Sequence, residues 1–243
     1  MNNQHAVITG GAGSLGLAAA KQLVEIGCSV SLIDKNEDSN KKAKELLGDL
    51  VTVYTYDASK KESIQEFSKT ILEKEGKITY LVNTVANNPH LPFKELTCEH
   101  MHKIVEEGLL AYAYTIRCFW DGLKENGSIV NVSSVHGTTT KYGNSMYAAS
   151  KAGVESLTRA LAAELREKKV RINAVAPGGF TSEFYVNEYP DWKEKLDKGQ
   201  IFTPEDMANV VMFLLGDNAK AVNGETIIAD GGVFTVRANS SDW

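Results

Sequence analysis

Tyr147 and Lys151 stand four residues apart in the segment Tyr147-Ala-Ala-Ser-Lys151, a spacing that puts two side chains on the same face of a helix. A free tyrosine loses its proton only near pH ~10, but a neighbouring ammonium group favours the phenolate and lowers the pKa. Such a phenol can act as a general acid or base near neutral pH. The same spacing also occurs by chance on solvated helix faces, so the pair needs support from its surroundings.

The residues around this pair predict a strand that ends beside a helix. Alanines and leucines recur with a period of about 3.6 residues and predict a helix over 147–166. The apolar residues of 128–132 predict a buried strand that runs out at Ser133-Ser134. Because open α/β sheets bind ligands at the carboxyl ends of their strands, a hydroxyl group placed there can reach a ligand.

Strand and helix patterns alternate along the whole chain. The predicted strands are 6–9, 29–33, 51–55, 80–82, 128–132, 170–175 and 226–228. The predicted helices are 15–26, 41–47, 60–75, 95–107, 109–124, 147–166 and 204–215. Strands separated by crossover helices predict a parallel, doubly wound sheet. We therefore expect an α/β protein with a single domain over residues 1–243.

The run Gly10-Gly-Ala-Gly-Ser-Leu-Gly16 lies between the first predicted strand and the first predicted helix. Glycines there let the backbone turn tightly and approach a pyrophosphate, which the amino terminus of the helix stabilises. Asp34 ends the next predicted strand about 18 residues later, close to the ~20 expected for a carboxylate that binds the ribose hydroxyls of NAD. That carboxylate repels the 2′-phosphate of NADP. Although the adjacent Lys35 can pair with such a phosphate, we expect NAD as the cofactor.

Composition limits the partners and the compartment. The chain has 243 residues, 43% of them hydrophobic, which is enough for the core of one α/β domain. Its 26 basic and 31 acidic residues give a net charge of −5, which argues against nucleic acid or an anionic membrane as a partner. The scattered cysteines suit a reducing compartment, and the histidines show no spacing typical of a metal site. With no targeting or membrane-spanning segment in the sequence, we expect a cytoplasmic protein.

Several segments together resemble the short-chain dehydrogenase/reductase family, over essentially the whole chain. They are Thr9-Gly-Gly-Ala-Gly-Ser-Leu-Gly16, Asp34, Asp57, Asn131-Val-Ser-Ser134, Tyr147-Ala-Ala-Ser-Lys151, Asn173-Ala-Val-Ala-Pro-Gly178 and Ala229-Asp-Gly-Gly232. The resemblance implies a Rossmann-like NAD-binding domain that carries its own substrate pocket and forms a homodimer or homotetramer. The helices 109–124 and 147–166 form the subunit surface in the family. Burial in the core is the competing explanation for some of the aromatic residues there, which are Tyr112, Tyr114, Phe119 and Trp120.

The resemblance also implies roles for individual residues. Tyr147 is the acid/base, Ser134 orients the substrate oxygen, and Lys151 binds the nicotinamide ribose and lowers the pKa of the tyrosine. The residues implied to contact the cofactor are Gly10, Gly13, Ser14, Leu15, Gly16, Asp34, Asp57, Ala58, Asn83, Tyr147, Lys151, Pro177, Gly178 and Thr181.

Three departures from the family pattern affect these roles. Ser14 takes the place of the middle glycine, which gives the spacing TGxxGxxG instead of TGxxxGxG. The segment Asn83-Thr-Val-Ala86 replaces Asn-Asn-Ala-Gly, so we expect a more crowded backbone near the adenosine ribose and weaker cofactor binding. The family's catalytic asparagine falls near Glu107 or Gly108, where this chain has none. A water molecule in the space beside Gly108 can replace it. Glu106 and Glu107 are expected to be solvated, with an approach of one of them to the proton relay as the alternative.

The substrate is expected to be small and polar, such as a sugar or polyol. Hydroxyl, amide and aromatic side chains are concentrated in the loops 87–93, 137–146 and 180–189. Such a lining suits a hydroxylated ligand better than a steroid or a fatty chain. His136 and Tyr185 are the candidate substrate contacts. The segment 178–203 is expected to form a substrate loop or lid, or alternatively a surface helix that Trp192 anchors.

These observations favour an NAD-dependent oxidoreductase that interconverts a secondary alcohol and a ketone. Two alternatives stay open. Gly108 and the altered segment 83–86 suit a catalytically weakened member that serves as a dinucleotide-binding or regulatory subunit. The glycine spacing suits an epimerase or dehydratase that recycles bound NAD, although the chain is short for that branch of the family.

Overall fold

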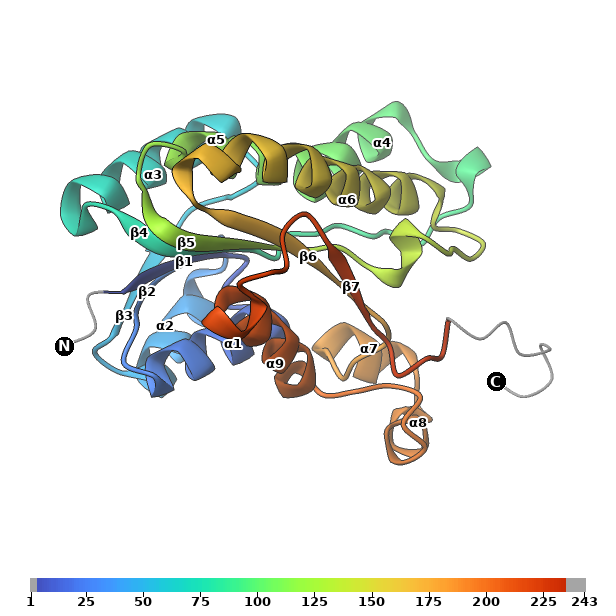
Figure 1. Cartoon of the computed structure of the whole chain (residues 1–243). Helices are drawn as coiled ribbons and strands as arrows, with labels where there is room; N and C mark the ends of the chain where they lie inside the picture. The colour runs from blue at the N-terminus through green and yellow to red at the C-terminus, as the bar shows by residue number, and fades with distance from the viewer. Residues whose placement is uncertain (1–3, 235–243) are drawn as a thin grey trace.

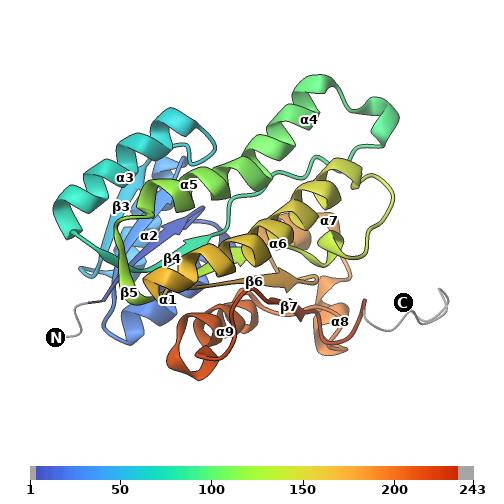
Figure 2. The same ribbon diagram turned by 45° about the horizontal axis from the view of Figure 1, so that its top comes forward.

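A single sheet lies at the centre of the molecule, with helices on both faces (Figure 1). The computed structural model of the protein describes residues 4–234, so both ends of the expected domain 1–243 lie outside the described residues. Helices α1, α2 and α9 cover one face of the sheet, and α3, α5 and α6 cover the other, where Figure 2 shows them side by side. This arrangement confirms the expected doubly wound α/β fold.

The sheet has seven strands in the order β3-β2-β1-β4-β5-β6-β7, and every neighbouring pair is parallel. The strands are β1 (His5–Thr9), β2 (Ser29–Asp34), β3 (Val51–Thr55), β4 (Ile78–Asn83), β5 (Leu123–Val132), β6 (Arg171–Pro177) and β7 (Thr226–Ala229). The strand order changes direction between β1 and β4. The crevice for a ligand is therefore expected where these two strands end.

The helices end at residues whose chemistry suits a terminus. The α-helices of the described chain are α1 (Ser14–Glu25), α2 (Glu37–Leu47), α3 (Lys61–Glu75), α4 (Cys98–Val105), α5 (Ala111–Phe119), α6 (Ser145–Leu165), α7 (Glu183–Glu188), α8 (Trp192–Asp197) and α9 (Pro204–Leu215). Thr203 and Asp206 form a capping box at the start of α9, and Pro204 occupies its first turn. None of the helices in the described residues is both long enough and apolar enough to cross a lipid bilayer.

The two faces of the sheet carry separate hydrophobic clusters. One lies under α1, α2 and α9 and contains small side chains such as Ala19 and Ala20, which let α1 pack close to the sheet. The other lies under α3, α5 and α6 and contains larger ones, including Phe67 and Phe119. The inner strands β1 and β4 are buried along their whole length, as expected for a parallel sheet covered on both faces.

The region before β5 differs from the prediction. The predicted helix 109–124 ends at Phe119, and β5 begins at Leu123, whose partner in the parallel pairing is Ile78. The stretch Glu106–Leu110 is a π-helix, η2, that joins α4 to α5. The apolar periodicity continues past Phe119 because the start of β5 also faces the core, so periodicity alone does not mark the change from helix to strand. The expected loop 178–203 contains the two short helices α7 and α8.

Candidate active site

The first two turns of α6 present Tyr147 and Lys151 at the carboxyl edge of the sheet. Lys151 is 1% exposed, and its Nζ lies 5.8 Å from the centre of the Tyr147 ring. The ammonium group donates hydrogen bonds to the carbonyl oxygen of Val132 at 2.9 Å and to the hydroxyl of Tyr112 at 3.3 Å. Ser134 follows β5 and lies close enough to the phenol of Tyr147 to lower its pKa. The structure therefore brings the three predicted catalytic residues together.

Burial controls the ionisation of the pair. It raises the pKa of Tyr147, against a smaller lowering by the nearby Ser134. It also lowers the pKa of Lys151 from 10.5 to about 7. Burial therefore reduces the charge of Lys151 at neutral pH, and the expectation that this charge lowers the pKa of the tyrosine stays a prediction. The phenol is protonated at pH 7 and can donate that proton.

Tyr112 is a neighbour of Lys151 that the sequence did not reveal. Its side chain is fully buried, and its hydroxyl donates to the carbonyl oxygen of Val132 at 3.0 Å while it accepts from Lys151. The expectation that Tyr112 and Phe119 belong to a subunit surface is wrong, because both lie in the core at 0% exposure. Tyr114 and Trp120 are half-buried against the same cluster. The sequence feature that could have pointed to Tyr112 is its spacing of four residues from Gly108, which is typical of residues on one helix face.

Gly108 lies close to α6. A Cβ atom added to it would lie 2.7 Å from the Oγ of Ser150, so α6 packs directly against the glycine. The replacement of the family's asparagine by a water molecule near this point stays a prediction. Gly108 allows the π-helix η2 to approach α6 closely. Irregular helical turns of this kind are frequent at functional sites.

The loop after β1 forms a cradle that fits a pyrophosphate. A cavity of about 250 Å³ extends from this loop to the catalytic residues. The predicted residues that line it are Gly10, Gly13, Ser14, Leu15, Gly16, Tyr147, Lys151, Pro177 and Gly178. Gly10 has φ +68°, and a Cβ atom on Gly16 would lie 2.6 Å from the carbonyl oxygen of Gly10, so the turn needs glycine at both positions. The free amino terminus of α1 favours an anion at this point.

A second cavity, of about 210 Å³, adjoins the cradle and is acidic. Asp34, Asp57 and Glu107 line it, together with Lys35 and Ala58. The carboxylate of Asp34 accepts from the backbone nitrogen of Ala12 at 3.3 Å. Glu107 is 5% exposed, which raises its pKa, and one of its oxygens lies 3.8 Å from the Nζ of Lys35. The expectation that Glu107 is solvated is wrong, because η2 turns it toward the end of β2.

Two predicted cofactor contacts do not line either cavity. Asn83 is completely buried, and its side chain donates to the Oδ1 of Asn131 at 2.9 Å and accepts from Thr9, so it ties β4 to its neighbours. Thr84 lines both cavities instead, and its hydroxyl lies 2.6 Å from where a Cβ atom of Gly10 would be. The backbone nitrogen of Thr181 donates to Phe202 at 2.9 Å, and the next residue, Ser182, reaches the cavity.

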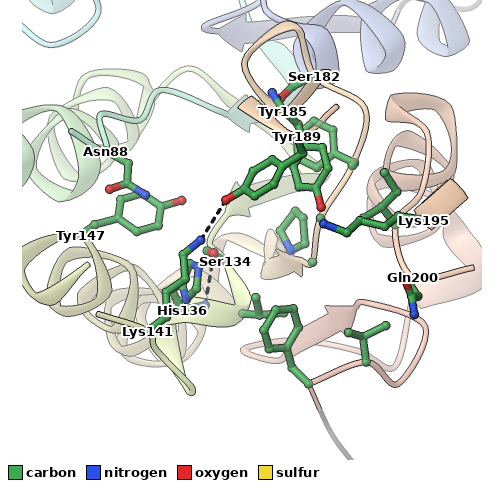
Figure 3. A pocket seen from close by; sticks show the side chains of 18 of the residues that line it. Asn88, Ser134, His136, Lys141, Tyr147, Ser182, Tyr185, Tyr189, Lys195 and Gln200 are labelled. Atoms are coloured by element: carbon green, nitrogen blue, oxygen red, sulfur yellow. Dashed lines mark hydrogen bonds between the residues drawn. The ribbon is translucent and has the colours of Figure 1, made fainter. Parts of the chain in front are cut away.

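A cavity of about 390 Å³ lies on the other side of Ser134 and Tyr147 (Figure 3). It shares these two residues, Pro177 and Gly178 with the cavity of the glycine loop, so the two spaces meet at the hydroxyls of Ser134 and Tyr147. Both candidate substrate contacts, His136 and Tyr185, line it. The ring of His136 stands edge-on to that of Tyr147 at 6.1 Å, and burial lowers its pKa, so the imidazole is neutral at pH 7.

Residues 10–234 match the family model described as Enoyl-(Acyl carrier protein) reductase. The chain is 28% identical to acetoacetyl-CoA reductase from Allochromatium vinosum over 240 residues, which cover 94% of this chain and 98% of that protein. It is 32% identical to 2,5-dichloro-2,5-cyclohexadiene-1,4-diol dehydrogenase from Sphingobium indicum, with 93% and 94% covered. The crystal structure of levodione reductase superposes with a TM-score of 0.87 at 27% identity, covering 95% of this chain and 97% of the other.

Proposed function

The chain belongs to the short-chain dehydrogenase/reductase family, and from this membership we propose that it is an NAD-dependent oxidoreductase that interconverts a secondary alcohol and a ketone on a small polar molecule. The observation that carries the proposal is the meeting of two cavities at Ser134 and Tyr147. One cavity offers a cradle for a pyrophosphate. The other offers a space for a substrate whose reacting oxygen reaches both hydroxyls.

Ser134, Tyr147 and Lys151 have different roles in proton transfer. In the direction of reduction, Ser134 donates a hydrogen bond to the substrate oxygen, and the protonated phenol of Tyr147 gives its proton to that oxygen as negative charge develops. In oxidation, the phenol oxygen takes the proton back. Lys151 lies within reach of the cofactor cavity, where its charge can stabilise the phenolate. When bound, the nicotinamide dinucleotide supplies or accepts the hydride.

The acidic cavity supports NAD in preference to NADP. Asp34 lies at the end of β2, where the family binds the adenosine ribose, and Asp57 and Glu107 add two carboxyl groups to the same space. A 2′-phosphate brought there would meet this negative charge, and Lys35 offsets only part of it because it already lies near Glu107.

The proposal extends to a homodimer or homotetramer. A groove between α5 and α6 is lined by Ile116, Trp120, Leu157 and Leu161, which supports contact between two copies at these helices. Light scattering on the purified protein, with Trp120→Glu as the perturbed variant, tests this part of the proposal.

The enzyme assay follows NADH formation across sugars, polyols, hydroxy acids and simple secondary alcohols, with NAD and NADP in parallel. Tyr147→Phe should abolish turnover, whereas Tyr142→Phe, which alters a tyrosine that is 82% exposed, should leave it unchanged. The missing asparagine near Gly108 and the altered segment 83–86 support the rival proposal of a dinucleotide-binding or regulatory subunit. Tight NADH binding without turnover of any compound would support that rival. NADH released from the protein as purified would instead point to cofactor recycling.

A further inference from the structure

The substrate cavity carries positive charge on a protein that is acidic as a whole. The chain has a net charge of −5, yet the described residues that line this cavity include Lys141 and Lys195 and no aspartate or glutamate. Two nearby carboxylates are already engaged. Asp191 pairs with Lys195 at 3.1 Å, and Asp230 accepts from the backbone nitrogens of Gly232 and Phe234 at 2.8 and 2.9 Å.

The two lysines approach one aromatic ring from different segments. Lys141, in the loop before α6, donates to the hydroxyl of Tyr189 at 3.2 Å. Lys195, on α8, lies 4.9 Å from the centre of the same ring. Figure 3 shows Lys141 and Lys195 on different sides of the cavity, with Tyr185 and Tyr189 close to both. A phenol hydroxyl and an ammonium group together form a donor pair for a carboxylate or a phosphate.

The ammonium group of Lys141 has no carboxylate in direct contact among the described residues, and Glu188 acts on the neighbouring His90. Within the part of the chain that the structure describes, Lys141 makes no ion pair. Burial and the charge of Lys141 lower the pKa values of His90 and His136, against smaller opposing effects of Glu188 on His90 and of the Thr139 backbone on His136, so both rings are neutral at pH 7. The rest of the wall is largely uncharged, with Phe180 and Ile201 among its apolar residues.

We infer that the substrate of this site carries an anionic group, a carboxylate or a phosphate, that binds Lys141 and the hydroxyl of Tyr189 while its alcohol or ketone lies at Ser134 and Tyr147. Lys195 lies near the same ring but is paired with Asp191, so Lys141 is the cation that the anionic group would meet. The inference rests on the proposed oxidoreductase activity and narrows it from small polar molecules in general to hydroxy acids or phosphorylated alcohols.

The experiment compares each anion with a neutral partner of the same skeleton. 3-Hydroxybutyrate is paired with its methyl ester, and glycerol 3-phosphate with glycerol, with NAD in excess. The wild-type protein should show a kcat/KM at least 10-fold larger for the anion of one pair, and which pair shows it distinguishes carboxylate from phosphate. Lys141→Met should lower kcat/KM for that anion by about 10- to 100-fold, mainly through KM, and change the neutral partner less than 3-fold.

Lys193→Met is the matched control. Lys193 lies on the same helix as Lys195, is exposed, and does not line the cavity, so its removal changes the net charge equally without changing the site. The preference for the anion should persist in this variant. Equal turnover of anion and neutral partner by the wild-type protein would overturn the inference, and so would an equal loss on both partners in Lys141→Met.

If neither pair is turned over, calorimetry of inorganic phosphate and 3-hydroxybutyrate with the NADH-loaded protein decides the question. Binding at least 10-fold weaker in Lys141→Met than in the wild-type protein supports the inference. Absence of binding to the wild-type protein overturns it. Anion binding that depends on Lys141 without turnover of any alcohol would contradict the oxidoreductase activity alone, so the two failures are distinguishable.

Discussion

Replacing Lys151 by methionine should make the cofactor-free protein more stable near pH 7 while it abolishes turnover. Burial lowers the pKa of this lysine from 10.5 to about 7, so folding at pH 7 removes about half of the proton that the unfolded chain holds there. At about 1.4 kcal/mol per pKa unit, the burial costs about 4 kcal/mol at pH 7. Methionine has a similar length and no charge to bury, so the variant avoids this cost.

The hydrogen bonds of Lys151 offset part of the gain. Its ammonium group donates to the carbonyl oxygen of Val132 and to the hydroxyl of Tyr112, and each bond contributes about 1 kcal/mol. The carbonyl oxygen of Val132 keeps Tyr112 as a donor at 3.0 Å, so methionine does not leave it without a partner. The expected net stabilisation of Lys151→Met is therefore about 2 kcal/mol at pH 7.

The pH dependence of the stability difference between Lys151→Met and the wild-type protein is a sharper test than its size at one pH. Between pH 7 and 10.5 the unfolded protein binds one more proton at this lysine than the folded protein, so the stability of the wild-type protein gains from rising pH in that window. Urea denaturation at pH 6.5, 7.5 and 8.5 should show the advantage of Lys151→Met shrinking as pH rises. The exposed Lys193→Met should change stability by less than about 0.5 kcal/mol throughout. A Lys151→Met protein that is less stable than wild type at pH 6.5, or a difference independent of pH, would refute the reasoning.

Three further outcomes are expected. Gly108→Asn should lower the free energy of unfolding, measured in urea, by about 1–3 kcal/mol without raising activity, because a Cβ atom at this position meets Ser150. If Ser150→Gly, combined with Gly108→Asn, fails to restore stability, this reason is contradicted. Asp34→Ala should raise kcat/KM with NADP relative to NAD by about 10-fold in parallel assays, and an unchanged ratio would contradict the assigned ribose contact. Arg171→Met should lower the free energy of unfolding by about 2–3 kcal/mol. The reason is that Arg171 donates to the carbonyl oxygens of Leu214, Leu215 and Gly216 at 2.8, 3.0 and 3.0 Å. A midpoint of thermal denaturation within 1 °C of the wild-type value would contradict this prediction.

Local patterns in the sequence were sufficient for most of the architecture. The alternation of apolar strands with amphipathic helices predicted the parallel sheet, and the capped start at Thr203 coincides with the predicted beginning of α9 at Pro204. The glycine run predicted the tight turn after β1, because the conformation of Gly10 follows from its lack of a Cβ atom. The spacing of Tyr147 and Lys151 placed both on one helix face. Each of these properties depends on residues close together in the chain.

Other properties depend on which distant residues become neighbours. The sequence does not distinguish Tyr112 from the other aromatic residues near it. Only the approach of α5 to α6 brings its hydroxyl to Lys151. The π-helix η2 buries Glu107 beside Lys35, and Gly108 meets Ser150 because two helices pack there. The sequence alone determined the sheet, the glycine cradle and the catalytic pair, since these follow from local periodicity and backbone freedom. The tertiary structure decided the charge of the pair and of the substrate cavity, because pKa values depend on burial and on contacts between residues far apart in the chain.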